Sequence, residues 1–134
     1  MIETHVLGWI GTAIAFLILD GIWLGFIAKN FYAKQLGSLK ADPIRVEFAV
    51  LFYLIYVTGL WLFAGSRTLD SSSFTDTFLL GAAIGFIAYC TYDLSNLAAT
   101  RNWPVKMAFV DIMWGTFASG VAAVAGRYAA TISF

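Results

Sequence analysis

Four long apolar runs constrain this chain more than any other feature of its sequence. A helix needs about 20 mostly apolar residues to cross the hydrocarbon core of a bilayer, which is about 30 Å thick. Four segments meet that requirement, and they cover residues 6–28, 46–64, 77–99 and 105–125. The sequence therefore predicts an all-α integral membrane protein, with residues 1–134 forming one domain of four transmembrane helices.

A soluble helical bundle is the alternative, and the composition disfavours it. The helices of a soluble bundle need polar outer faces, and residues 48–63 offer none. Of the 134 residues, 60% are hydrophobic and only 12% are charged, whereas about 25% are charged in an ordinary soluble domain. The N-terminus lacks the positively charged region of a signal peptide, so we expect the first apolar run to be retained as a span.

The scarcity of charged and metal-binding residues excludes several functions. The net charge is zero, and no basic patch follows a nucleic-acid backbone, so we expect no nucleic-acid partner. His5 is the one histidine and Cys90 the one cysteine. We therefore expect neither a structural zinc site nor a haem held by two histidines. The sequence identifies no other cofactor.

The basic residues are divided unequally between the two ends of the predicted bundle. Six of the eight lie in or beside the connections between the first and second spans and between the third and fourth. Because such loops face the cytoplasm, we expect both termini on the outer, periplasmic side. Residues 30–39 mix lysines with aromatic and leucine side chains. They fit either a short amphipathic helix on the membrane surface or an ordinary loop.

Three of the four spans contain an aspartate. At 1.5 Å per residue, Asp20 and Asp93 lie about 12 Å from the cytoplasmic ends of their spans, and Asp111 about 8 Å. Inserting each carboxylate costs about 2.5–3.5 kcal/mol, so all three should face the bundle interior. No lysine or arginine lies at that depth. At least one carboxyl group should therefore be protonated unless a cation is bound.

Other polar side chains fall near this acidic layer. The second span contributes Tyr53 and Tyr56 at a similar depth. On the third span, Tyr89, Asp93 and Asn96 follow helical spacing and share one face. These residues extend the predicted acidic layer into a polar pocket.

A short sequence echo connects the first and fourth spans. Asp20 is followed three residues later by Trp23, and Asp111 by Trp114. The two spans run in opposite directions, so the shared D-x-x-W pattern hints at an inverted arrangement. Both tryptophans are candidate pocket residues, although packing is their more common role.

We predict that these side chains form a buried acidic pocket for an ion or small molecule. The predicted ligand-binding residues are Asp20, Asp93, Asn96, Asp111, Tyr53, Tyr56, Tyr89, Trp23 and Trp114. If a metal ion is bound, its expected ligands are Asp20, Asp93 and Asp111.

Small residues predict close helix packing. Gly21 and Gly25 form one G-x-x-x-G pattern and Gly81 and Gly85 another, and such patterns let helix backbones approach closely. Because four helices make a small permeation unit, we also expect a homo-oligomer, with these faces as candidate contacts.

Five motifs together resemble an uncharacterised family of small bacterial predicted membrane proteins, domain of unknown function twenty-one seventy-seven. The motifs cover residues 19–25, 52–56, 89–98, 102–104 and 111–115. The resemblance implies a multi-pass protein of the bacterial inner membrane and brings no established activity.

Three functions fit these observations. The first is a binder or carrier of an ion, a proton-coupled solute or a small molecule, with the aspartates as coupling groups. The second is a membrane-embedded enzyme that modifies a lipid or isoprenoid and uses the carboxylates as metal ligands or acid/base groups. No nucleophile–base pair supports it, since no histidine is available. The third is an accessory subunit whose aspartates only stabilise the bundle. We favour the first, a transport or binding role rather than an enzyme.

Overall fold

The apolar runs form four long helical elements in the computed structural model, which describes residues 1–132. The first is α1 (Ile2–Ile22), which continues into the π-helical turn η1 (Trp23–Ile27). The second is α3 (Val46–Leu60), followed by η3 (Trp61–Gly65) and η4 (Ser66–Thr68). The third and fourth are α4 (Phe74–Ala99) and α5 (Val105–Ala130). All four are long and apolar enough to cross a bilayer, which confirms the predicted all-α fold of four transmembrane helices.

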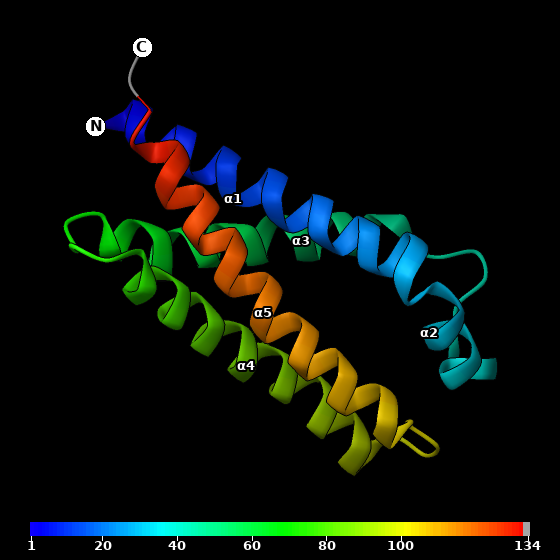
Figure 1. Cartoon of the computed structure of the whole chain (residues 1–134). Helices are drawn as coiled ribbons and strands as arrows, with labels where there is room; N and C mark the ends of the chain where they lie inside the picture. Colours follow the sequence, from blue (N-terminus) through cyan, green and yellow to red (C-terminus); the bar gives the residue numbers. More distant parts are fainter. Residues whose placement is uncertain (133–134) are drawn as a thin grey trace.

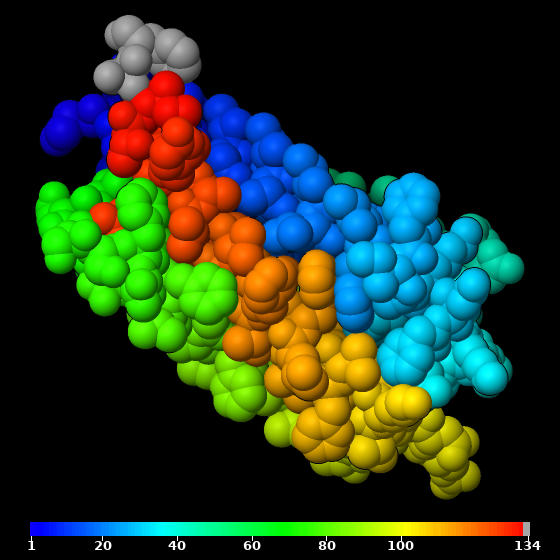
Figure 2. All heavy atoms as spheres, viewed as in Figure 1, coloured from blue at the N-terminus to red at the C-terminus, as the bar shows by residue number. Residues whose placement is uncertain are grey.

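A short helix connects the first two spans. It is α2 (Lys29–Leu36), followed by the 3-10 turn η2 (Gly37–Leu39). Of the two alternatives for residues 30–39, the helical one is therefore formed. Helix α2 crosses this end of the bundle and lies beside the start of α5, as the adjacent cyan and yellow-orange surfaces in Figure 2 show.

The fourth helix extends past the predicted boundary at residue 125. The reason is Arg127, which is buried although it is charged. Its guanidinium donates hydrogen bonds to the carbonyl oxygens of Ser71 and Ser73 and, at 2.8 Å, to the hydroxyl oxygen of Thr77. Because the turn before α4 satisfies these donors, the charge does not need water. The helix can therefore continue to Ala130.

Helix α5 lies between α1 and α4 and packs against both along most of its length (Figure 1). The apolar core forms where these helices meet α3, around Phe16, Val57, Leu60 and Ala122. The start of α1 and the end of α5 lie at the same end of the bundle (Figure 1). We call the opposite end, which carries residues 28–45 and 100–106, the basic end.

Large apolar side chains cover the outside of the bundle. Ile14 is 54% exposed, Phe86 52% and Met113 73%. Such extensive exposure would promote aggregation in water, but it suits contact with lipid tails. The outer surface therefore agrees with a multi-pass membrane protein.

Helices α3 and α4 diverge toward the basic end. Helix α4 packs against η3, at the far end of the second span, but has few contacts with α3 itself. In Figure 1 the end of the second span lies close to the start of α4, and the two green helices separate toward the basic end. This divergence leaves an opening in the half of the bundle that contains the aspartates.

Close packing through glycine joins α4 to α5. A Cβ atom added at Gly81 would lie 2.8 Å from the carbonyl oxygen of Ser119, and one at Gly85 would lie 2.5 Å from that of Gly115. The packing prediction is thus confirmed for this pair. The prediction is not confirmed for Gly21. An added Cβ there would meet nothing within 4 Å, because that side of α1 faces outward.

We expect Gly85→Ala to destabilise the protein by about 1–3 kcal/mol, because the new methyl group overpacks a backbone contact. The matched change Gly21→Ala should leave stability unchanged or raise it slightly, since alanine favours helices. Thermal unfolding of the detergent-solubilised protein measures both. Equal unfolding temperatures for the two variants would contradict this account of α4–α5 packing.

Candidate functional site

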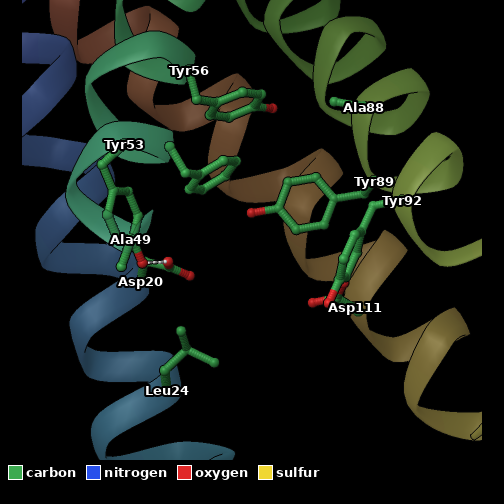
Figure 3. A pocket seen from close by; sticks show the side chains of 10 residues that line it. Asp20, Leu24, Ala49, Tyr53, Tyr56, Ala88, Tyr89, Tyr92 and Asp111 are labelled. Atoms are coloured by element: carbon green, nitrogen blue, oxygen red, sulfur yellow. Dashed lines mark hydrogen bonds between the residues drawn. The ribbon is translucent and has the colours of Figure 1, made fainter. Parts of the chain in front are cut away.

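A cavity of about 400 Å³ lies between the diverging helices α3 and α4, with α1 and α5 also contributing to its walls (Figure 3). It is lined by Asp20, Leu24, Ala49, Phe52, Tyr53, Tyr56, Ala88, Tyr89, Tyr92 and Asp111. Five of these ten residues are among the nine predicted from the sequence to bind a ligand. The other four predicted residues do not line it, namely Trp23, Asp93, Asn96 and Trp114.

Asp20 lies near the end of α1 and is only 6% exposed. One carboxylate oxygen accepts a hydrogen bond from the Tyr53 hydroxyl, and the other accepts one from the Trp114 indole N–H at 3.2 Å. The donors come from α3 and α5, so this single carboxylate connects three helices. Two donors also offset part of the cost of placing a carboxylate at this depth.

Asp111, in the second turn of α5, obtains its donor from outside the spans. The hydroxyl of Tyr32, on α2, donates to Asp111 Oδ1 at 3.0 Å and accepts a hydrogen bond from the Trp23 indole at 3.2 Å. Burial raises the pKa of the Tyr32 hydroxyl, so this group stays a donor. Sequence reasoning missed Tyr32, because nothing in the residue pattern indicates that α2 turns back to α5.

The two D-x-x-W motifs exchange hydrogen bonds. Trp114 donates directly to Asp20, whereas Trp23 reaches Asp111 through one tyrosine hydroxyl. The two indole rings stack with their centroids 4.5 Å apart and their planes 6° from parallel. Each tryptophan thus serves the other motif's aspartate, and the short sequence echo has a structural counterpart between the antiparallel helices α1 and α5.

Aromatic rings form most of the remaining cavity wall. The Tyr56 hydroxyl lies 2.6 Å from that of Ser119, and its ring meets that of Tyr89 edge to face at 6.2 Å. Tyr89 lies directly against Gly115, where an added Cβ would be 2.2 Å from the ring. Figure 3 shows the Tyr89 hydroxyl pointing into the cavity. Phe52 stacks on Tyr56, with the ring centroids 5.5 Å apart.

Sequence reasoning did not select Phe52 or Tyr92 as cavity residues. A signal for Tyr92 was present, since it follows Tyr89 by three residues on the same helix. Phe52 carries no polar atom and resembles any lipid-facing aromatic residue. Only the separation of α3 from α4 shows that these two rings line the cavity.

Asp93 and Asn96 do not line the cavity. The Asp93 side chain is fully buried, and neither carboxyl oxygen has a hydrogen-bond partner. The carboxyl group of Asp111 and the indole of Trp103 lie beside it. Asn96 donates to a backbone carbonyl one turn earlier and accepts from the Thr100 hydroxyl at 3.1 Å. The polar face predicted for the third span is therefore divided between the interior and the end of the helix.

The three aspartates do not form one cluster. Asp20 and Asp111 face the cavity from opposite sides (Figure 3), and Asp93 lies next to Asp111 alone. Within residues 1–132, no three histidine, cysteine, aspartate or glutamate side chains gather closely enough to hold a metal ion. The arrangement instead presents two separated carboxyl groups to a mostly aromatic space.

Comparison with protein families matches residues 5–128 to a family described as "Predicted membrane protein (DUF2177)". This match confirms the resemblance that the five motifs indicate. Comparison with curated proteins and with solved structures found no match.

We expect Tyr32→Phe to destabilise the fold by about 1–3 kcal/mol, because it removes the donor to the half-buried carboxylate of Asp111. The control is Tyr128→Phe, the same change at a residue that is 64% exposed. Chemical unfolding in detergent, followed by tryptophan fluorescence, measures both variants. If the two variants unfold alike, the Trp23–Tyr32–Asp111 chain does not stabilise the protein.

Proposed function

We propose that this chain, which belongs to the family of predicted membrane proteins, binds an ion or small molecule in the cavity between α3 and α4. It carries this ligand through the membrane, and the transport is coupled to proton transfer. Asp20 and Asp111 are the polar contacts for the ligand. Tyr53, Tyr56 and Tyr89 complete the binding site.

One observation carries this proposal. Four helices bring two carboxyl groups and three predicted tyrosines to the wall of a single cavity. Aspartates that only stabilised a bundle would be expected in dry packing and not beside open space. A cavity of about 400 Å³ also falls within the range of small-molecule sites.

The lining residues favour binding over lipid modification. They include no lysine, arginine or histidine. The cavity therefore has no basic side chain to hold a phosphate group and no imidazole to activate a nucleophile. Its titratable groups are carboxyl and phenol groups, which suit proton exchange and cation binding.

Asp93 supplies the coupling in this proposal. Its carboxyl group is fully buried beside that of Asp111, and neither Asp93 oxygen accepts a hydrogen bond. Adjacent carboxylates repel each other, so we assign the coupling proton to the buried Asp93. A ligand that contacts Asp111 from the cavity then competes with that proton.

The expected location follows from the family and the basic end. We propose that the protein lies in the bacterial inner membrane with the basic end in the cytoplasm, since six of the eight lysine and arginine residues lie there. The cavity then opens in the cytoplasmic half of the bilayer.

Proteoliposomes that contain a trapped pH indicator test the proposal. Na⁺, K⁺ and a panel of organic amines are added outside, and the proton flux driven by each is recorded. We expect at least one to drive flux in the unmodified protein. Asp20→Asn and Asp111→Asn should each reduce it about tenfold or more, which corresponds to ~1.4 kcal/mol of lost interaction.

Asp70→Asn is the matched control, because Asp70 is exposed in the turn before α4 and lies far from the cavity along the chain. It should leave the flux unchanged. Folded Asp20 and Asp111 variants with full flux would reject the carrier. Variants that lose stability, in a protein that shows no flux with any solute, would instead support a purely structural role.

A further inference from the structure

The cavity wall also indicates the chemical class of the ligand, in an inference that rests on the proposed function. We infer that the cavity takes a monovalent organic cation with an apolar body, which enters sideways from the bilayer between α3 and α4.

The charge of the wall favours a cation. Asp20 and Asp111 are its only ionisable groups of low intrinsic pKa, and no basic side chain lines it. An anion would meet two carboxyl groups without a counter-charge, which is unfavourable in a low-dielectric site. The carboxyl groups lie on opposite sides (Figure 3), so a compact metal ion would contact only one of them.

The chemistry of the remaining wall favours an organic cation over a hydrated inorganic ion. Five of the ten lining side chains are aromatic, and three others are apolar. Aromatic faces attract cations that have lost their water, by about 0.5–2 kcal/mol per ring, and groups of such rings recognise quaternary ammonium ligands. An inorganic ion would need oxygen ligands that these rings do not supply.

The opening toward lipid is formed by two of the same rings. Phe52, on α3, is 47% exposed, and Tyr92, on α4, is 54% exposed, although both line the cavity. They lie where the two helices separate, within spans whose outer surface is apolar. A ligand arriving through this gap passes aromatic rings.

The route from the aqueous side is less suitable for a cation. The basic end carries six lysine and arginine residues, including Lys106 near the Phe31 ring and Arg45 near the Phe48 ring. These charges would repel an approaching cation. A cation with an apolar body avoids them because it first enters the lipid leaflet and then moves laterally into the cavity.

Binding of benzyltrimethylammonium to the protein in lipid nanodiscs tests this inference. We expect saturable binding of the radiolabelled cation. Neopentylbenzene has the same shape but a carbon atom in place of the charged nitrogen, and it should compete at least about tenfold less well. Asp20→Asn should weaken binding of the cation by a similar factor, since it removes the carboxylate but keeps the size and shape of the side chain.

Tryptophan substitutions locate the site. Ala88→Trp fills the cavity and should abolish binding. Ala83→Trp, on the exposed side of the same helix, should not affect it. Ala49→Trp provides the same test from the α3 wall if the Ala88 variant does not fold.

The outcomes separate this inference from the proposed function. Equal competition by neopentylbenzene, or no saturable binding of the cation, would overturn the cation inference. The carrier proposal would still stand if the proton flux depends on Asp20 and Asp111. Binding that survives in the folded Ala88 variant would place the cation outside the cavity and overturn the cation inference as well.

Discussion

The structure depends on the exchange of hydrogen bonds between two D-x-x-W motifs on antiparallel helices. A carboxylate within a bilayer is tolerated only where donors are available, and here each motif supplies a donor to the other. Trp114 donates to Asp20, and Trp23 reaches Asp111 through Tyr32. The stacked indoles hold α1 and α5 at one relative position. The bridging hydroxyl also explains why α2 lies beside the start of α5.

The cavity follows from how the other two spans attach to this pair. Helix α4 is held against α5 by glycine contacts at Gly81 and Gly85. Helix α3 is attached differently, through the hydrogen bonds of Tyr53 to Asp20 and of Tyr56 with Ser119. Since α4 attaches to α5 whereas α3 attaches to α1 as well as to α5, nothing requires α3 and α4 to pack on each other at the basic end. The interactions that stabilise the fold therefore also keep the site open.

Hydropathy alone predicted the four spans, because a helix that is apolar on every side has no face suited to water. The cost of inserting charge predicted that Asp20, Asp93 and Asp111 face inward, and helical depth placed two of them in the same cavity. Depth and periodicity describe one helix at a time, so they did not show that Asp93 turns away from the cavity. Tyr32 and Arg127 were missed for a related reason, because each is satisfied by partners far along the chain.

The hydrogen bonds of Asp20 also bear on which cation the cavity suits. Both carboxylate oxygens already accept a donor, from Tyr53 and Trp114. About two of the four lone-pair sites of the carboxylate therefore remain for a ligand. A primary ammonium brings three N–H donors that need acceptors, and it would have to compete with donors that hold α3 and α5 in place. A quaternary ammonium donates no hydrogen bond and needs only charge and aromatic faces. A site whose carboxylate is already committed to the fold is therefore better matched to the second kind of cation.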